Sequence, residues 1–251
     1  MSNVLVVGDS CTDVFIYGEI ERLSPEAPVP VFNPIKKVKN GGMSKNVVAN
    51  LNALGCNVDI ITNRDEIKKT RYIHIDTNQM IIRVDVDDKC EQIDEPVRMN
   101  ICNNRYHGTV YDAIIISDYC KGFLTELDIE LICKSNKNVF MDTKKIFGKW
   151  ATYADYIKIN SLEFDRNKEI IPKYSELNEK LIVTRGRYGC NFRDKLFSVE
   201  EVSVKDVSGA GDTFLAALVS EYLKSEDIEK SIRFAQLCTT KVVQKHGVST
   251  V

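Results

Sequence analysis

Short apolar runs alternate with amphipathic stretches along the chain, and this alternation restricts the fold more than any other feature. The runs that are too short for helices, and that we interpret as buried strands, are 4–7, 58–61, 113–117, 139–141, 156–159 and 181–184. The amphipathic stretches include 44–54, 125–135 and 211–224. Apolar strands separated by helices predict an α/β fold with a mainly parallel central sheet, covered by helices on both faces.

Two regions, 14–38 and 71–86, break this alternation. The first is rich in proline, and the second alternates apolar and polar side chains around a turn at 76–78. An alternation of period two is typical of antiparallel strands with one solvated face. We expect both regions to form one small β-sheet, which projects as a lid over a site or as a dimer surface. The sequence shows no repeat and no linker, so we predict a single domain over 1–251.

Composition narrows the class of protein. The chain has 251 residues, of which 43% are hydrophobic and 28% charged, and this balance excludes a disordered chain. Its net charge of −2 argues against a nucleic-acid protein with a broad basic surface. No apolar stretch is long enough to span a membrane, and the N-terminus has no basic leader. Eight cysteines without a C-x-x-C pair indicate free thiols in a reducing compartment. We therefore expect a cytoplasmic enzyme or small-ligand binder.

The segment 206–214, D-V-S-G-A-G-D-T-F, carries the clearest signal of chemistry. We expect a strand over 196–204, then a turn of small residues that opens a helix. Gly209 and Gly211 allow backbone N–H groups to approach an anion, and the helix start adds partial positive charge. An aspartate at this position could simply cap the helix. Beside a bound phosphate, however, Asp212 could accept a proton from an attacking hydroxyl.

Two common nucleotide-binding motifs are missing from the sequence. The chain has no G-x-x-x-x-G-K-[ST] segment, and Gly8 does not open a G-x-G-x-x-G segment. A Walker-type phosphate loop and a dinucleotide-binding fold are therefore disfavoured.

The 206–214 segment resembles the signature of ribokinase-like (PfkB-type) sugar kinases, and the resemblance extends over nearly the whole chain. Further motifs are similar to the D-glycero-β-D-manno-heptose 7-phosphate kinases of that family. These motifs are Gly8-Asp9 with Asp13, Tyr17-Gly18, 22–31, Gly41-Gly42 with Asn46, Ser117-Asp118-Tyr119 with Lys121-Gly122, 183–186 with Gly189, and Val242-Val243 with Lys245 and Gly247. The S-P-E-A-P-V-P-V run within 22–31 discriminates best, because general sugar kinases of this fold lack it.

The resemblance implies a ribokinase-like three-layer sandwich and a reaction in which ATP phosphorylates the anomeric hydroxyl of the heptose 7-phosphate. Asp212 matches the catalytic base of the family. Backbone N–H groups from Gly209, Ala210, Gly211 and Asp212 would hold the charge of the transferred group. Mg²⁺ would bridge the phosphates. Asn160 and Glu163 match an N-x-x-E element that helps to place the metal through waters, with no direct protein ligand; alternatively, the pair is only a polar helix cap.

The resemblance also implies residues for the sugar and the nucleotide. Sugar recognition would involve Asp13, Gly41, Gly42 and Asn46, although Asp13 taken alone could be a turn residue. The candidate cations for the 7-phosphate are Arg83, Lys121 and Lys45, each of which could instead be a solvated surface charge. Thr184, Gly186, Ser208 and Gln236 would flank the nucleotide, together with Asn160 and Glu163. We expect His74, His107 and His246 to be structural.

The chain departs from the family in three places. It is short after Thr62, so that 63–69 must bridge directly to the lid. The glycine motif that contains Gly41 and Gly42, G-G-M-S-K-N, is one residue longer than is usual in the family. Gln236 stands where relatives commonly have an asparagine near the adenine. The alternatives are therefore a kinase for another phosphosugar, such as fructose 6-phosphate or tagatose 6-phosphate, and a non-catalytic nucleotide- or sugar-binding relative.

The family further implies a homodimer through the lid and a role in making activated heptose for lipopolysaccharide or another surface glycan. The H-x-G-H motif of a fused adenylyltransferase is missing, so we expect a kinase unit alone.

Overall fold

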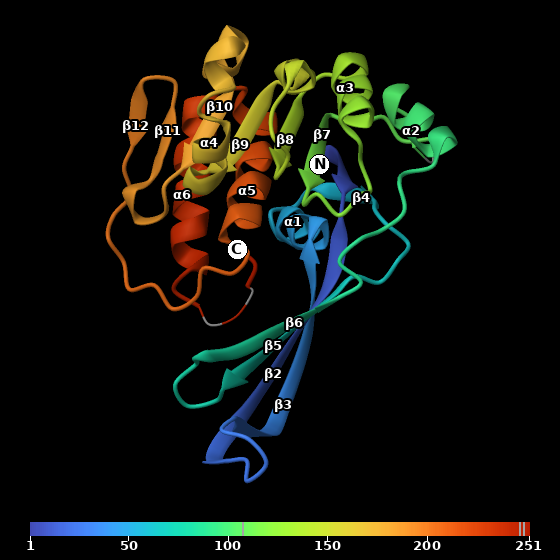
Figure 1. Ribbon diagram of the computed structural model, residues 1–251. Helices are drawn as coiled ribbons and strands as arrows, with labels where there is room; N and C mark the ends of the chain where they lie inside the picture. The colour runs from blue at the N-terminus through green and yellow to red at the C-terminus, as the bar shows by residue number, and fades with distance from the viewer. Residues whose placement is uncertain (107, 246, 248) are drawn as a thin grey trace.

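A computed structural model describes residues 1–106, 108–245, 247 and 249–251, which form two β-sheets and their covering helices (Figure 1). The strands are β1 Asn3–Gly8, β2 Ser10–Leu23, β3 Pro30–Met43, β4 Asn57–Ile61, β5 Lys68–His74, β6 Met80–Val86, β7 Ala113–Asp118, β8 Val139–Thr143, β9 Tyr156–Asn160, β10 Leu181–Thr184, β11 Cys190–Phe192 and β12 Lys195–Phe197. The α-helices are α1 Ser44–Ala53, α2 Glu95–Cys102, α3 Glu126–Ser135, α4 Ser161–Asn167, α5 Ala210–Ser225 and α6 Ile228–Val242; short 3₁₀ helices cover Lys149–Tyr153, Ile171–Lys173, Ser175–Glu179 and Gly186–Tyr188.

The central sheet has the strand order β12-β11-β10-β9-β8-β7-β1-β4. Neighbouring strands from β4 to β10 pair in parallel, and the β11–β12 hairpin adds antiparallel strands at one edge. Each of the predicted strands corresponds to one of the parallel strands, so the predicted α/β fold with a mainly parallel sheet is confirmed.

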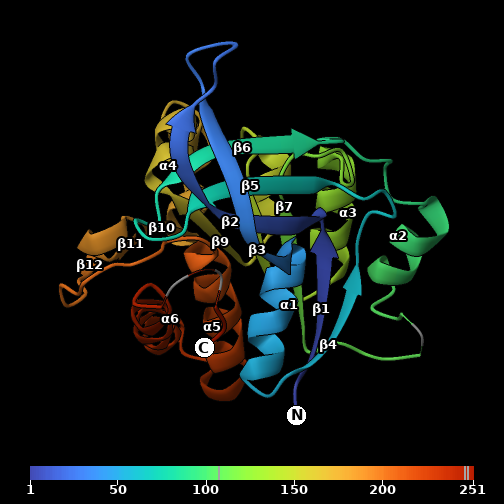
Figure 2. The ribbon, with the colours of Figure 1, turned by 90° about the horizontal axis from the view of Figure 1, so that it is seen from below.

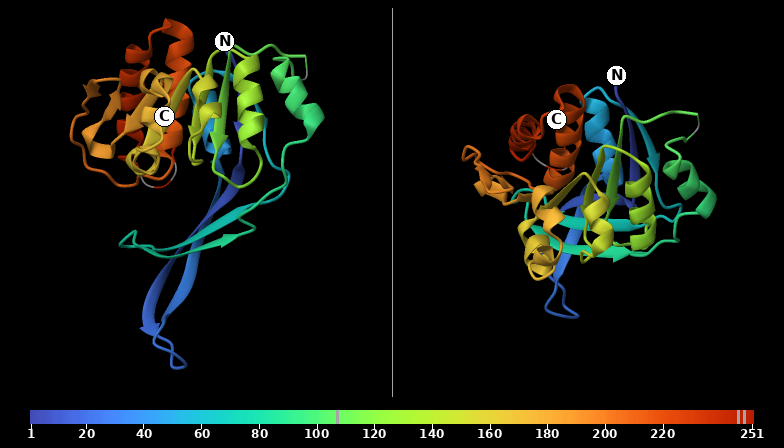
Figure 3. Two further views of the ribbon diagram at one scale, coloured as in Figure 1. Left: turned by 45° about the horizontal axis from the view of Figure 1, so that its top comes forward. Right: turned by 90° about the horizontal axis from the view of Figure 1, so that it is seen from above.

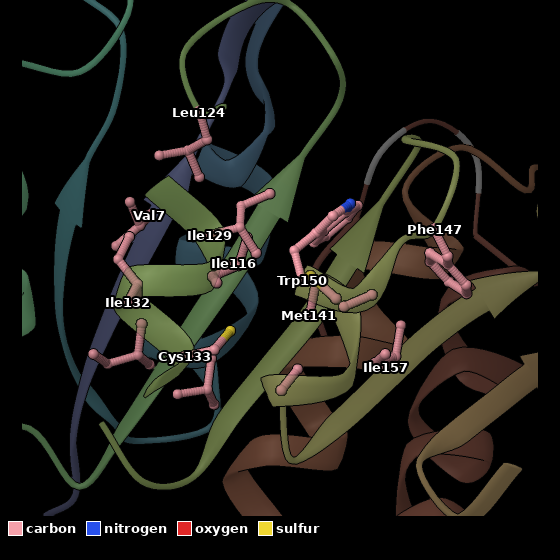
Figure 4. Packing of buried hydrophobic residues seen from close by; sticks show 14 of the residues in the cluster. Val7, Ile116, Leu124, Ile129, Ile132, Cys133, Met141, Phe147, Trp150 and Ile157 are labelled. Atoms are coloured by element: carbon pink, nitrogen blue, oxygen red, sulfur yellow. The ribbon is translucent and has the colours of Figure 1, made fainter. Parts of the chain in front are cut away.

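Helices cover both faces of this sheet, which gives three layers (Figure 3). Alternate residues of a strand point to opposite faces. Val4 and Val6 of β1 pack with α1, α5 and α6, whereas Leu5 and Val7 pack with α2, α3 and the 3₁₀ segment at 149–153. Figure 4 shows the second cluster, in which side chains of α3 lie against β1 and β7. No helix within the described residues is both long and apolar enough to cross a membrane.

The second sheet, which we call the lid, has the strand order β3-β2-β5-β6. It contains both regions that the sequence analysis assigned to a small sheet, over the wider ranges 10–43 and 68–86. The β2–β3 and β5–β6 pairs are antiparallel, and β2 pairs with β5 in parallel. β2 follows β1 after Asp9 alone, so the lid begins at the carboxyl ends of the parallel strands and projects beyond them (Figures 1 and 2).

Two further expectations can be compared with the structure. The direct bridge after Thr62 is confirmed: β4 is the edge strand, and only 62–67 separate it from β5. The strand expected over 196–204 is wrong, because β12 covers only Lys195–Phe197. The apolar residues after β12 have a different use: Val199, Val202 and Val204 line a cavity beside α5.

Candidate active site

Asp212 lies in the first turn of α5 and is 5% exposed. The residue before this helix, Gly209, has φ 78°, a left-handed conformation that a glycine adopts without strain. The first N–H groups of a helix have no acceptor within it. Ala210 donates to the carbonyl of Val207, so the amides of Gly211 and Asp212 remain as the first-turn donors for an anion.

Two side chains from distant segments donate hydrogen bonds to the Asp212 carboxylate. Asn46 Nδ2 donates to Oδ2 over 2.8 Å, and the Tyr119 hydroxyl donates to Oδ1 over 2.7 Å. Asn46 lies in the first turn of α1, which begins directly after Met43 with its φ of 57°. Tyr119 follows β7 and was not among the residues that the sequence predicted.

The electrostatic surroundings of Asp212 favour a proton-accepting role. Burial is the main cause that raises the pKa of this carboxyl, and the nearby Asp142 carboxylate raises it further. The hydrogen bonds from Asn46 and Tyr119 and the charge of Lys158 act in the opposite direction. A carboxylate whose pKa is raised towards neutrality is a stronger general base than an ordinary aspartate.

A buried chain of ion pairs runs from the Asp212 region to the start of α4. Lys158 on β9 pairs with Asp142 on β8, and Lys144 bridges Asp142 at 2.9 Å and Glu163 at 2.5 Å. A Cβ built on Gly211 would lie 2.8 Å from Lys158 Nζ, so this ammonium lies against the first turn of α5. Burial alone would raise the pKa of Asp142, but both lysines outweigh it and hold the pKa below its ordinary value. The sequence signal that could have identified Lys158 is the presence of a lysine inside the apolar run 156–159.

Asn160 and Glu163 form a capping box at the start of α4. Asn160 Oδ1 accepts the N–H of Glu163 over 2.9 Å, and Glu163 Oε2 accepts the N–H of Asn160 over 2.8 Å. The other oxygen of Glu163 contacts Lys144. The polar-cap interpretation is therefore realised in the structure, and it leaves lone pairs on Glu163 for a water. Among the residues that the structure describes, no three His, Cys, Asp or Glu side chains gather to hold a metal ion.

A cavity of about 220 Å³ lies beside the first turn of α5. Its lining brings together Thr184, Gly186, Ala210, Gly211 and Gln236 with apolar residues of the 199–207 segment. The Gln236 amide donates to the carbonyl of Phe197 over 2.6 Å, which fixes its side chain against β12. Ser208 and Gly209 precede the helix just outside this lining, and the Ser208 N–H donates to Asp206.

Asp13 lies inside β2, not in a turn, so the turn interpretation is wrong. It is 8% exposed, and its Oδ1 accepts a hydrogen bond from Arg71 on β5. A Cβ at Gly42 would lie 2.2 Å from Asp13 Oδ2, which explains why β3 carries glycine there. The neighbouring Gly41 is exposed and lies beside the Lys45 side chain.

Two of the candidate cations, one on the lid and one after β7, are already paired with carboxylates. Arg83 pairs with Asp85 on its own strand at 2.9 Å, and Lys121 pairs with Asp88 at 2.5 Å. The hydrogen bond from Lys121 lowers the pKa of Asp88, and the charges of Lys69 and Arg83 lower it further. Lys69 was not among the candidate cations that the sequence predicted.

One face of the lid carries most of these groups. Cross-strand pairing puts Lys69 opposite Asp13 and Asp85, and Arg71 opposite Arg83. Cys11 lies on the same face of the lid. Burial raises the pKa of its thiol to about 12, and the nearby carboxylates of Asp13 and Asp212 raise it further, so this face lies near Asp212. The sugar-site candidates on β2 thus lie near the candidate base.

Of the three histidines, His74 is the one among the residues that the structure describes. His74 Nδ1 accepts the N–H of Thr77 in the β5–β6 turn, which fits the expected structural role. His107 and His246 lie outside the described residues.

Comparisons with known proteins agree with this geometry. Residues 64–251 match the profile described as pfkB family carbohydrate kinase. The bifunctional protein HldE of a Nitratiruptor species is 33% identical over 98% of this chain and 62% of its own length, and HldE of Helicobacter pylori is 30% identical over 98% and 64%. The chain thus spans less than two thirds of the length of these relatives.

Solved structures share the fold at low sequence identity. The nucleoside kinase of Methanocaldococcus jannaschii, an archaeal member of the ribokinase family, superposes with a TM-score of 0.69 at 17% identity, covering 99% of this chain and 93% of the other. Phosphofructokinase-2 of Escherichia coli, in complex with potassium, reaches 0.73 at 12% identity, covering 99% and 94%. Arabidopsis thaliana ribokinase complexed with ribose and ATP reaches 0.68 at 15% identity, covering 98% and 94%. The ribokinase-like fold is confirmed.

Proposed function

The chain belongs to the pfkB family of carbohydrate kinases, and we propose that it transfers the γ-phosphoryl group of ATP to the anomeric hydroxyl of D-glycero-β-D-manno-heptose 7-phosphate. The observation that carries this proposal is Asp212, a buried carboxylate in the first turn of α5, directly after the G-A-G turn and beside the cavity that Gly211 lines. A binding protein without catalysis has no need of a base at the edge of its phosphate site, so the structure favours the enzyme over the non-catalytic alternative.

In the proposed reaction, Asp212 removes the proton of the 1-hydroxyl as its oxygen attacks the γ-phosphorus. The bond from that phosphorus to the ADP oxygen breaks, ADP leaves, and the proton stays on Asp212 until it is lost to solvent. A carboxylate offers about four lone-pair directions. Asn46 and Tyr119 occupy one on each oxygen, so a lone pair remains on each for the sugar hydroxyl.

The transferred phosphoryl group would be held by the N–H groups of Gly211 and Asp212 and by the Lys158 ammonium. Ala210 leaves the set that the sequence resemblance implied, because its N–H donates to the carbonyl of Val207. Adenosine would occupy the cavity that Thr184, Gly186 and Gln236 line, and Ser208 and Gly209 directly precede the helix α5 beside it.

Mg²⁺ is proposed as the metal, bound through the nucleotide phosphates and through waters near Asn160 and Glu163. Magnesium commonly keeps several waters and needs few protein ligands. The donors fit this indirect role, because Glu163 has spare lone pairs beside its contacts with Asn160 and Lys144. When bound, the metal supplies positive charge that offsets the charge of the phosphates.

The heptose is proposed on the sequence motifs, and the likeness to HldE proteins supports it. Asp13 and Asn46 would bind sugar hydroxyls, with Gly42 leaving room for the Asp13 carboxylate and Gly41 next to it on β3. Arg83 and Lys121, joined by Lys69, would bind the distal phosphate. Because such a set of cations accepts any sugar phosphate, fructose 6-phosphate and tagatose 6-phosphate are the alternatives to be tested.

We also propose a homodimer through the lid, in a cytoplasmic enzyme. Three apolar side chains share one face of β6 and are 40–54% exposed: Ile82, Val84 and Val86. A contiguous apolar row of this kind often marks an interface. A dimeric mass by light scattering supports the proposal, and a monomeric mass at working concentration contradicts it.

The test of function is ADP release coupled to NADH oxidation, with Mg²⁺-ATP and the heptose 7-phosphate against fructose 6-phosphate, tagatose 6-phosphate and ribose. We expect turnover on the heptose that disappears in Asp212→Asn and on chelation of Mg²⁺. Turnover on a different sugar phosphate alone would keep the mechanism and replace the substrate. Retained nucleotide binding with no turnover on any sugar would support the non-catalytic alternative.

A further inference from the structure

Two motifs that the proposed reaction does not use meet beside Asp212. The G-D pair ends β1, and the S-D-Y segment ends β7, the neighbouring parallel strand. Their side chains do not line the nucleotide cavity, yet Tyr119 contacts the candidate base and Asp9 contacts the backbone of Tyr119.

Tyr119 is suited to hold the Asp212 carboxylate in one orientation. Its hydroxyl donates to Oδ1 over 2.7 Å, while Asn46 donates to Oδ2, so that both oxygens are held. The ring packs beside the apolar cluster of Cys11, Met43 and Ile67, which limits its movement. Burial, followed by the charges of Asp212 and Asp142, raises the pKa of Tyr119 well above its ordinary value, so the hydroxyl stays a neutral donor.

Asp9 in turn fixes the segment that carries Tyr119. Its carboxylate is fully buried and accepts the N–H groups of Tyr119 at 2.6 Å, Lys121 at 3.3 Å and Phe123 at 3.3 Å. The Asp9 backbone is tied as well: its N–H donates to Ser117 and its carbonyl accepts from Ser44 at the start of α1. Asp9 therefore connects the ends of β1 and β7 with α1, the helix that carries Asn46.

We infer that Tyr119 is a positioning residue, which holds the carboxylate of Asp212 in the orientation that accepts the proton of the sugar hydroxyl, and that Asp9 acts through Tyr119 by fixing its backbone. The inference rests on the proposed role of Asp212 as the base. Its physical basis is that a carboxylate held from both sides loses little rotational freedom when the reaction begins, and such preorganisation lowers the barrier.

The inference also fixes the sign of a pH effect. The groups that face Asp212 are Asn46 on α1, Tyr119 after β7, Lys158 on β9, Asp142 on β8 and Cys11 on β2. The Tyr119 hydrogen bond is one of the contacts that lower the pKa of Asp212. Its loss in Tyr119→Phe therefore raises that pKa, and the acid limb of the rate profile moves to higher pH.

The first experiment compares Tyr119→Phe with Tyr111→Phe. Each substitution removes one tyrosine hydroxyl that donates to an aspartate over 2.7 Å, but Tyr111 contacts Asp59 on the edge strand β4. We expect kcat of Tyr119→Phe to fall about tenfold to a hundredfold, with the KM of the sugar little changed and the acid limb moved upward. Tyr111→Phe should keep the wild-type profile. An unmoved acid limb in Tyr119→Phe, or the same displacement in both variants, overturns the inference.

A second readout does not depend on catalysis. The carboxyl ¹³C shifts of aspartate-labelled protein, followed over pH, give the pKa of Asp212 once Asp212→Asn has identified its signal. We expect a higher pKa in Tyr119→Phe than in wild type. If no sugar is phosphorylated but the pKa of Asp212 rises in Tyr119→Phe, the proposed function is wrong and the effect of Tyr119 on Asp212 is confirmed. If the pKa of Asp212 is unchanged in Tyr119→Phe, the inference itself is wrong.

A double-mutant cycle tests the role of Asp9. If Asp9 acts through Tyr119, Asp9→Asn lowers kcat strongly in the wild type and less than about twofold in the Tyr119→Phe background. Equal losses in both backgrounds would show that Asp9 acts elsewhere. Asp9→Glu, which keeps the charge and shifts the carboxylate by one methylene, replaces Asp9→Asn if that variant does not fold.

Discussion

The side-chain amide of Asn46 donates to Asp212 Oδ2 over 2.8 Å, although 166 positions separate the two residues. Asn50, one turn further along α1, supports this contact: its Nδ2 donates to the Asn46 carbonyl, and its Oδ1 accepts from Thr213 of α5. The pair of helices α1 and α5 thus holds a sugar-site candidate and the candidate base in one buried network. This arrangement makes Asn46 a sensitive position.

We predict that Asn46→Asp makes activity strongly dependent on pH. A second carboxylate beside buried Asp212 replaces a donor with a like charge, which raises the pKa of Asp212 further and leaves a larger fraction of it protonated at a given pH. Activity should fall at least about tenfold at pH 7 and recover partly at higher pH. Asn52→Asp, an exposed position on the same helix, is the control and should behave as wild type. A wild-type pH profile in Asn46→Asp would mean that Asn46 does not act on the base.

Asp212→Asn should lose activity and gain stability. General-base catalysis contributes about a hundredfold or more, and that part of the rate should disappear. Burial raises the pKa of Asp212 in the folded state, so the folded protein binds a proton more tightly than the unfolded chain does. Stability is therefore lost as the pH rises from the ordinary aspartate value through the folded pKa, and the neutral asparagine avoids this loss. We expect a higher melting temperature than wild type at pH 8 and a smaller difference at pH 5. A difference that grows on acidification would contradict the sign.

Asp88→Asn should strengthen binding of the sugar phosphate. Asp88 pairs with Lys121, and Lys69 and Arg83 also act on it, so it competes with a substrate phosphate for the same cations. We expect the KM of a sugar phosphate to fall severalfold with kcat unchanged, and the effect to weaken at high salt. Asp94→Asn is a matched control, because Asp94 is also an exposed carboxylate paired with a basic residue, Arg64. An unchanged KM in Asp88→Asn would remove these cations from the phosphate site.

The sequence predicted best those residues whose role is written in a local pattern. Asp212 was identified because the glycines beside it have no other explanation, and the parallel strands because each is a short, mainly apolar run. Tyr119, Lys158 and Arg71 were missed as site residues because each becomes significant only through a partner on another element. The strand expected over 196–204 failed for a related reason: closely spaced valines also suit a cavity wall, and only the tertiary structure distinguishes the two uses.

The Lys158–Asp142 pair allows stability and activity to be separated. Both side chains are almost fully buried, so Lys158→Met leaves Asp142 with Lys144 as its remaining cationic partner. We expect this variant to be destabilised by less than the about 3–5 kcal/mol that a fully unpaired buried charge costs. Asp142→Leu combined with Lys158→Met removes both charges and should recover much of that loss, because buried pairs can often be replaced by apolar residues. Lys158 also lies against the first turn of α5, where the transferred phosphoryl group is proposed to bind. We therefore expect the double variant to unfold, in urea, close to wild type and yet to retain little phosphotransfer. If the double variant were as active as wild type, Lys158 would have only a structural role. The backbone amides of α5 would then stabilise the charge of the phosphoryl group without Lys158.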